Sequence, residues 1–206
     1  MPKFSIVIPT WTNDAKLEQM AYDCARSYKQ YVDEIIICED GGRFSPKLQS
    51  IADVYIYNWE NVGFTKNVNR GWRYSQGDFT GIVSSDTYLY DGDPRDLCKV
   101  GKVTSPEIIN QHIPYLAGPF WVCPKPIFET RGGLIETMHT YNSDSEYDHR
   151  VRDIFEKVPT VAIYHHMAQS VTPAGVNTPE QAQKDQEEYE KLKVDENHES
   201  NNSSNT

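Results

Sequence analysis

The sequence has little of what marks nucleic-acid-binding or membrane-spanning proteins. Its 206 residues include 20 Lys and Arg against 30 Asp and Glu, a formal net charge of −10. A general nucleic-acid-binding protein needs a basic surface to neutralise phosphates, so we expect no nucleic-acid partner. Uninterrupted apolar runs of about 20 residues are missing, and we therefore expect no membrane span.

Cysteine is scarce, and several nucleotide-binding and catalytic motifs are missing. The four cysteines (Cys24, Cys38, Cys98 and Cys123) are widely spaced and form no C-x-x-C pair. This spacing is typical of reduced thiols in a cytoplasmic protein rather than of a disulfide framework or a zinc site. The sequence has no G-x-x-x-x-G-K-[ST], G-x-G-x-x-G or G-x-S-x-G. Phosphate-loop, dinucleotide-binding and hydrolase assignments are therefore unsupported.

Short apolar runs alternate with helical patterns through the first 86 residues. We expect strands at 4–9, 34–38, 54–57 and 79–83, with helices that start after Asp14 and near Thr65. This alternation predicts an α/β fold, with a mostly parallel central sheet and helices on both faces. Prolines break up 99–129 into short strands and loops. From residue 127 onward we expect helices at 127–137 and 144–155 and a last strand at 161–164.

The chain divides by composition. We expect one folded domain over residues 1–178, a charged helix over 179–196 and a disordered tail or linker over 197–206, which is rich in Asn and Ser.

Polar residues follow three of the predicted strands where each ends. These are Thr10, Glu39 with Asp40, and Ser84 with Ser85 and Asp86. Ligands of parallel sheets bind beyond the carboxyl ends of the strands, so we expect these side chains at one crevice. Asp86 is placed to ligate a hard divalent cation or, alternatively, to cap a turn. Glu39 is placed to accept hydrogen bonds from a ribose or a base, although turn chemistry is the better explanation when this motif is taken alone.

The second half carries three further candidate groups. Asp144 and Glu146 lie at a predicted helix start, with Arg150 one turn beyond Glu146. They fit either a general base with an orienting partner or an ordinary charged first turn. His165 and His166 follow an apolar strand and fit metal or phosphate binding, or simple packing. Phe120 and Trp121 fit stacking on a sugar or an aromatic core.

Taken in order, these motifs resemble family 2 glycosyltransferases of the GT-A fold, over about residues 4 to 173. On the nucleotide-sugar side, the resemblance rests on residues 4–10, 33–42, 61–71 and 77–87. On the acceptor side, it rests on residues 117–121, 132–136, 144–150 and 165–170, which include Ala117 and Ser170. The sequence departs from the usual family pattern in having Glu39 for an Asp and Ser84 for the first acid of D-x-D.

The resemblance implies an inverting, metal-dependent, hexosyltransferase-type enzyme, with residues 1–178 as its GT-A-like catalytic domain. Asp144 would be the catalytic base, and Asp86 with His165 or His166 would hold Mn²⁺ or Mg²⁺. Nucleotide-sugar binding is implied for Pro9, Thr10, Glu39, Asn61, Gly63, Asn67, Ser85 and Asp86. Phe120, Trp121, Glu146 and Arg150 would lie on the acceptor side.

The implied substrates are a nucleotide-diphosphate sugar and a glycan acceptor. A UDP-sugar is favoured, with dTDP- and GDP-sugars as alternatives. The compact chain resembles glycosyltransferase domains of bacterial polysaccharide loci and large DNA viruses, so we expect the cytoplasm, or the host cytoplasm, and further domains could follow the tail. The alternative functions are a non-catalytic nucleotide-sugar- or carbohydrate-binding module and a sugar nucleotidyltransferase.

Overall fold

The computed structural model describes residues 2–116, 118–167 and 179–203, with side chains described up to residue 192. Of the segments that carry the resemblance, Ala117 and residues 168–170 lie outside these ranges. The strands are β1 (Phe4–Thr10), β2 (Glu34–Asp40), β3 (Val54–Asn58), β4 (Phe79–Val83), β5 (Thr87–Asp91), β6 (Val103–Ile108), β7 (Phe120–Pro124) and β8 (Phe155–His165). The helices are α1 (Ala15–Tyr28), α2 (Pro46–Ile51), α3 (Phe64–Tyr74), α4 (Lys125–Arg131), α5 (Ser143–Val151) and α6 (Pro179–Ser203), with short 3₁₀ helices η1 (Pro94–Leu97) and η2 (Arg152–Ile154).

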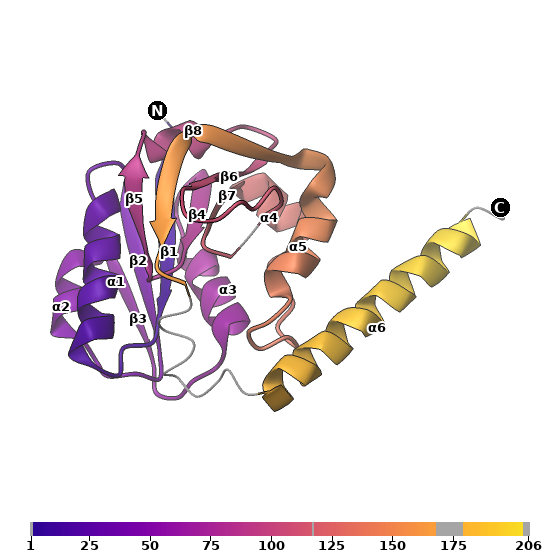
Figure 1. Cartoon of the computed structure of the whole chain (residues 1–206), viewed down its shortest axis with the longest axis horizontal. Coiled ribbons are helices and arrows are strands. Elements are labelled where there is room, and N and C mark those ends of the chain that lie inside the picture. The colour runs from indigo at the N-terminus through magenta and orange to yellow at the C-terminus, as the bar shows by residue number, and fades with distance from the viewer. Residues whose placement is uncertain (1, 117, 168–178, 204–206) are drawn as a thin grey trace.

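Within the described ranges the strands form one eight-stranded sheet in the order β3-β2-β1-β4-β7-β6-β8-β5. The β3-β2-β1-β4 half is parallel throughout. The other half is mixed, because β7 runs antiparallel to β4 and β6, while β6 pairs in parallel with β8 and β5 pairs with β8 in antiparallel fashion. The predicted α/β class and parallel sheet core are confirmed, and all the polar strand ends of the parallel half meet at one edge (Figure 1).

Helices cover both faces of this sheet, as the sequence predicted (Figure 1). Because side chains alternate along a strand, β1 sends Ile6 and Ile8 into one core and Val7 into the other. The first core is shared with α1 and α2. The second is shared with α3, α4 and α5, where Trp72 and Tyr147 are buried against the sheet. The two cores fix the sheet between its helix layers.

Two helix starts differ in how they are capped. Asp14 caps α1 as predicted, because its side chain accepts a hydrogen bond from the Leu17 backbone N–H. The Thr65 cap predicted for α3 is wrong, since the N-cap is Gly63 with a φ of 92°. Thr65 lies inside the helix, and its hydroxyl donates instead to the Met138 backbone oxygen at 2.6 Å. The Thr65 hydroxyl, which the local sequence pattern predicted as a helix cap, therefore bonds instead to a backbone carbonyl far along the chain.

The second half departs most from the predicted boundaries. The expected 144–155 helix ends at Val151, because Phe155 already pairs with Val103 at the start of β8. The strand expected at 161–164 is consequently longer, and β5 and α2 were not predicted at all. Helix α6 spans Pro179–Ser203, where a helix was expected over 179–196 and a disordered tail or linker beyond it.

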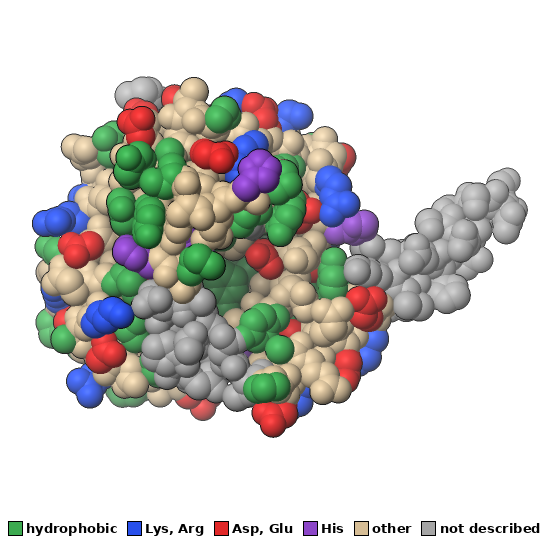
Figure 2. Space-filling model, in the orientation of Figure 1, with side chains coloured by type: hydrophobic (Ala, Val, Ile, Leu, Met, Phe, Trp, Pro, Cys, Tyr) green, Lys and Arg blue, Asp and Glu red, His purple; other side chains and the backbone are tan. Residues whose placement is uncertain are grey.

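On the face drawn in Figure 2, acidic and basic side chains are interspersed around a hollow near the centre. No helix among the described residues is both long enough and apolar enough to cross a membrane.

Gly71 tests the packing of α3 on the sheet. A Cβ at this position would lie 2.7 Å from the Cys38 Sγ and closer still to Val7. Although Ala is the better helix former, we expect Gly71→Ala to destabilise the fold by about 1–3 kcal/mol through overpacking. Thermal unfolding would measure this loss, with the exposed α3 substitution Lys66→Ala as control. A Gly71→Ala variant at least as stable as the parent would contradict this close packing.

Candidate active site

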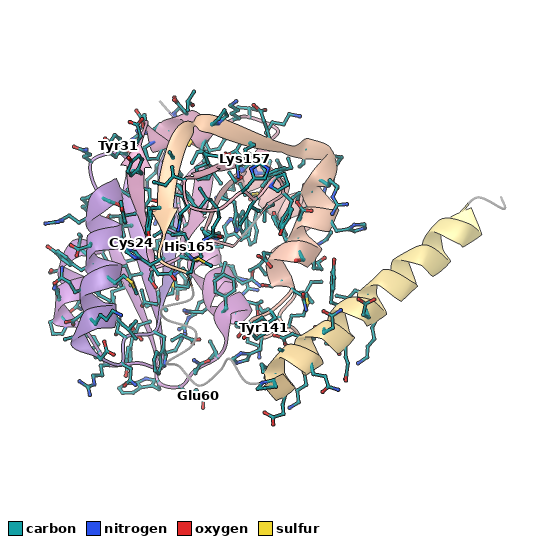
Figure 3. The ribbon with its side chains drawn as sticks, viewed as in Figure 1. Cys24, Tyr31, Glu60, Tyr141, Lys157 and His165 are labelled. Atoms are coloured by element: carbon teal, nitrogen blue, oxygen red, sulfur yellow. The ribbon has the colours of Figure 1, made fainter. Side chains whose placement is uncertain are left out.

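A cavity of about 420 Å³ opens at the carboxyl edge of the parallel strands. Pro9 from the end of β1 and residues 84–86 after β4 form one side. The loop between β6 and β7 contributes Gln111 and Tyr115, and the segment 140–145 brings the start of α5. His165 at the end of β8 and Tyr141 in the loop before α5, both labelled in Figure 3, also line it. The cavity therefore joins the parallel half of the sheet to the C-terminal half.

Asp86 and His165 form a polar pair in this cavity. Asp86 Oδ1 lies 3.3 Å from His165 Nε2, and their side chains are 4% and 15% exposed. His165 Nδ1 lies 2.9 Å from the Gln111 side-chain nitrogen. Gln111 thereby orients the imidazole.

His166 points elsewhere. Its backbone N–H donates to the Asp86 backbone oxygen at 2.8 Å. Its ring lies 5.0 Å from that of Tyr164 and 5.7 Å from that of Tyr88, and it lines a second cavity beside α1. Of the two histidines that the sequence left open as ligands, His165 is the one whose ring reaches the Asp86 carboxylate.

The donor set at this pair suits a divalent cation that shares its coordination with a diphosphate. Mg²⁺ in phosphate-handling sites is typically held by one or two carboxylates together with substrate oxygens and water. Asp86 supplies such a carboxylate and His165 an imidazole. In the part of the chain that the structure describes, no cluster of three or more His, Cys, Asp or Glu side chains could hold a metal by itself. A metal here would need oxygen ligands from substrate.

Asp144 is the second residue of α5, and its half-buried carboxylate lines the same cavity. Oδ2 accepts a hydrogen bond from the Gly118 backbone N–H at 3.0 Å, and Oδ1 accepts one from the Ser145 N–H at 2.9 Å. A Cβ on Gly118 would lie 3.3 Å from Oδ2, so the glycine lets this loop approach closely. Two backbone donors thus fix the direction in which the carboxylate points.

Glu39 does not line this cavity. It is fully buried, and its carboxylate accepts hydrogen bonds from the Thr12 and Gly42 backbone N–H groups and from the Thr10 and Thr12 hydroxyls. Burial raises the pKa of Glu39, and these hydrogen bonds oppose the rise. The predicted nucleoside contacts Thr10 and Glu39 are therefore bonded to each other, and they brace the loop after β1.

The other predicted donor residues surround Asp40, outside the cavity lining. The Asp40 carboxylate accepts from the Val62 and Gly63 N–H groups, and Asn58 donates to it as well. Asn61 accepts a second bond from the Gly63 N–H, and buried Asn67 donates to the Cys38 backbone oxygen. Burial raises the pKa of Asp40 against these hydrogen bonds. Asn61, Gly63 and Asn67 thus shape the loop into α3.

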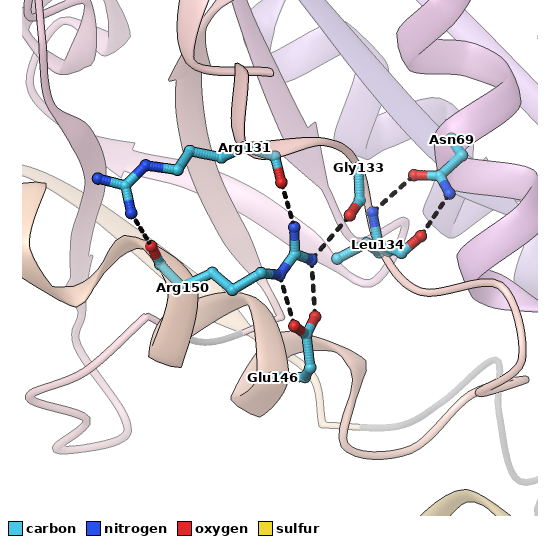
Figure 4. A network of polar contacts seen from close by, with 6 residues as sticks. All are labelled: Asn69, Arg131, Gly133, Leu134, Glu146 and Arg150. Atoms are coloured by element: carbon cyan, nitrogen blue, oxygen red, sulfur yellow. Dashed lines mark hydrogen bonds and ion pairs between the residues drawn. The ribbon is translucent and has the colours of Figure 1, made fainter. Parts of the chain in front are cut away.

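The residues expected on the acceptor side do not line the cavity. Phe120 and Trp121 are each 1% exposed and belong to the two cores. Glu146 and Arg150 form a two-point ion pair, with 2.6 Å between Glu146 Oε2 and Arg150 Nη2. Arg150 also donates to the Gly133 backbone oxygen, while Asn69 holds Leu134 in the same segment (Figure 4). This network joins α5, the segment after α4 and α3.

Sequence reasoning missed several cavity residues. Gln111, Tyr115, Tyr141 and Asn142 line the cavity, yet none belongs to a motif that we singled out. Gln111 and Tyr115 lie in the segment interrupted by prolines, where no hydrophobic periodicity distinguishes residues that face the interior from residues that face the cavity. The Asn142 φ of 59° is a conformation that Asn tolerates better than most residues, but that signal does not indicate function.

The four cysteines take no part in the site. Burial raises the pKa of each thiol to about 12. All four are free thiols, and Cys98 alone is only half-buried. They are therefore protonated at neutral pH and poor nucleophiles.

Similarity to solved structures identifies the class of the fold. The crystal structure of residues 1–349 of Staphylococcus aureus TarS matches with a TM-score of 0.63 at 15% identity, covering 89% of this chain and 68% of that one. The full TarS structure is covered over 42% of its length. A mannosyltransferase of Pyrobaculum calidifontis, in complex with GDP-Man and Mn²⁺, matches with a TM-score of 0.60 at 14% identity, covering 84% of this chain and 59% of that one. These matches define a GT-A-type glycosyltransferase fold.

The sequence itself supplies the family. The model of the family described as glycosyl transferase family 2 matches residues 5–155, nearly three quarters of the chain. The chain therefore belongs to glycosyl transferase family 2 and is a glycosyltransferase. No curated protein sequence matches it significantly.

Glu39 allows a test of its bracing role. Burial raises the pKa of Glu39 in the folded protein, so the folded state binds the carboxyl proton more tightly than the unfolded state does. The free energy of unfolding should therefore fall as the pH rises from the ordinary Glu pKa of about 4.3 through the raised pKa of the folded state. Glu39→Gln keeps the same shape, so we expect near-parent stability without that fall. Glu39→Ala leaves two backbone N–H groups unpaired and should cost about 1–3 kcal/mol.

Thermal unfolding between about pH 4 and 7 measures these differences. The exposed substitution Glu60→Gln is the control for loss of a charge. A Gln variant as unstable as the Ala variant would contradict the bracing role.

Proposed function

We propose that the chain is an inverting, metal-dependent glycosyltransferase of the hexosyltransferase type. It would move a sugar from a nucleotide-diphosphate donor to a hydroxyl group of a glycan acceptor. The observation that carries this proposal is one cavity lined by Asp86 with His165 and by Asp144, which are remote in sequence. A metal-binding pair and a carboxylate base around a common space would supply the charge stabilisation and the proton acceptor for a single displacement at an anomeric carbon.

Asp144 accepts the proton of the acceptor hydroxyl as its oxygen bonds to the anomeric carbon, and the bond from that carbon to the diphosphate oxygen breaks. Attack from the side opposite the leaving diphosphate inverts the anomeric configuration. Asp86 and His165 would hold Mn²⁺ or Mg²⁺, and the cation would offset the negative charge that builds on the diphosphate. The backbone N–H groups of Gly118 and Ser145 keep Asp144 oriented during the transfer.

The donor assignment follows the neighbours. TarS is known in complexes with UDP and UDP-GlcNAc, and the mannosyltransferase in a complex with GDP-Man. We favour a UDP-sugar, with GDP- and dTDP-sugars as alternatives, and an acceptor from polysaccharide or glycoprotein glycan synthesis. Ser85 and Pro9 line the cavity beside Asp86 and would contact the donor directly, whereas Thr10, Glu39, Asn61, Gly63 and Asn67 would support its nucleoside end from behind.

Two assignments concern the chain as a whole. We propose residues 1–178 as the catalytic domain. The free thiols of all four cysteines support a reducing compartment, and we propose the cytoplasm, or the host cytoplasm for a viral chain.

A thermal-shift screen of nucleotide sugars, with and without Mn²⁺, tests the donor and the metal together. A ligand that binds only the folded state raises the melting temperature once its concentration exceeds its dissociation constant. We expect one nucleotide class to raise it, and to do so far more with Mn²⁺ than with a chelator. No shift with any nucleotide sugar would refute donor binding.

Asp144→Asn tests the base. Positioned general bases contribute about 10²- to 10⁴-fold, so we expect turnover to fall within that range, since the amide cannot accept the proton. Donor affinity should stay near the parent value because the amide keeps the carboxylate's shape. Initial transfer rates and donor titrations measure both. Asp153→Asn, in the 3₁₀ helix η2 that follows α5, is the control. Parental turnover in the Asp144→Asn variant would remove Asp144 from the mechanism.

Asp86→Asn tests the metal. Loss of one carboxylate charge from a two-residue site should abolish most of the metal-dependent part of donor affinity, so we expect the dissociation constant in Mn²⁺ to approach the value in chelator. Isothermal titration with the nucleotide diphosphate measures this difference. Asp91→Ala, at an exposed strand end, is the control. A Mn²⁺ effect as large as that of the parent would rule out Asp86 as a ligand.

A further inference from the structure

Asp185 is a fully buried carboxylate on a helix whose neighbouring acids are exposed or half-exposed. It belongs to α6, which begins beside the loop before α5 and then extends away from the body (Figure 1). The family match ends at residue 155, so α6 lies beyond the matched span. A carboxylate this buried needs partners that compensate for its lost hydration.

Its partners are three consecutive backbone N–H groups. Oδ1 accepts from His139 at 2.9 Å, and Oδ2 accepts from Thr140 at 2.8 Å and from Tyr141 at 2.7 Å. Successive N–H groups that point to one place form a concave binding site for an anion. Gln181 of α6 also donates to Oδ1 at 2.8 Å. The 139–142 loop is therefore bound around a side chain from a distant helix.

Burial alone would raise the pKa of Asp185, but the three N–H groups and Gln181 lower it below its ordinary range. The carboxylate is consequently charged at neutral pH, the state in which both oxygens accept hydrogen bonds.

The opposite side of the same loop contacts the donor half of the molecule. The Thr65 hydroxyl donates to the Met138 backbone oxygen, and the His139 ring packs so closely on Gly63 that a Cβ there would lie 2.6 Å from it. Gly63 in turn donates to Asp40. The 139–142 loop is thus held between α3 on one side and α6 on the other.

This loop leads directly to the proposed base. Thr140, Tyr141 and Asn142 line the cavity, and α5 starts at the next residue. The Asn142 backbone oxygen accepts from the Glu146 N–H at 2.9 Å, closing the first turn that carries Asp144. Since Asp144 is three residues from Tyr141, a shift of the loop would move the carboxylate relative to the cavity.

We propose that Asp185 is a positioning residue, which holds the 139–142 loop so that Asp144 and the loop side chains keep their places in the cavity. This role rests on the proposed transferase function. Its loss should slow the transfer step far more than it weakens nucleotide binding. Asp86, His165 and the strand ends are not among its partners, and Gly63, which the loop touches, is held independently by Asp40 and Asn61. Helix α6 would then be part of the working site despite lying outside the family span.

Asp185→Ala and Asp185→Asn test this role in the full chain. We expect hydrogen exchange of a peptide covering residues 138–142 to accelerate by about tenfold or more in the Ala variant, since three amides lose their acceptor. We expect turnover to fall by about 10- to 100-fold through misplacement of the base, with the dissociation constant for nucleotide diphosphate changing by less than about twofold.

The Asn variant should fall between the parent and the Ala variant, because its remaining oxygen can still accept from Thr140 and Tyr141. It also keeps the test informative if the Ala variant does not fold. Glu187→Ala is the matched control, since Glu187 lies on the same helix, is exposed and bonds only within α6 to Gln183. It should leave exchange and turnover at parental values.

Four results would overturn the proposal. Unchanged exchange in both Asp185 variants would show that Asp185 does not hold the loop. Faster exchange with parental turnover would show that the hold does not serve catalysis. If the variants melt at a lower temperature than the parent but keep parental turnover when assayed well below that temperature, Asp185 has a structural role only. If the parent protein itself transfers no sugar, the proposed function fails and the positioning role falls with it, a case recognised because the parent, not the variants, is inactive.

Discussion

Carboxylates that accept backbone N–H groups from loops hold the carboxyl edge of this sheet in shape. Loops at a sheet edge lack the regular partners of strands and helices, and buried N–H groups left unpaired are costly. Glu39 accepts from Thr12 and Gly42, and Asp40 accepts from Val62 and Gly63. Asp144, Asp148 and Asp185 do the same for Gly118, Leu116 and residues 139–141. Much of the acidic character around the site is therefore structural.

These carboxylate contacts support the two sides of the site through different parts of the fold. On the side of the parallel strands, Glu39 and Asp40 end β2 itself, so the loops they hold are tied directly to the sheet. On the other side, Asp144 stands on a short helix whose position depends on the 139–142 loop and on the Glu146–Arg150 pair beneath it. In the proposed reaction, Asp86 and Asp144 can act together only if these separately supported segments keep their relative positions. Chemistry at such sites is sensitive to small displacements for that reason.

The sequence predicted the parallel half of the fold well because its signals are local. Buried strands such as 34–38 and the Asp14 cap follow from side-chain type and spacing alone. The convergence of Asp86 and Asp144 on one cavity was also expected, through order and resemblance. Glu39 was expected at the same pocket, but the structure bonds it to Thr10 and Thr12 instead. Local sequence patterns could not predict features that depend on contacts between distant parts of the chain. Examples are the hydrogen bond from Thr65 to Met138, the start of β8 at Phe155, and the burial of Asp185 on a charged helix.

The raised pKa values of Cys24, Cys38, Cys98 and Cys123, of which only Cys98 is half-exposed, keep the native thiols protonated at neutral pH, and this has a consequence for labelling experiments. A cysteine introduced on an accessible surface would react with a thiol-specific label much faster than the four native cysteines, so no native cysteine would need to be replaced. Spin or fluorescent labels placed that way on α6 and on the body would report the distance between them as substrates arrive. The native thiols would stay in place as packing groups of the interior.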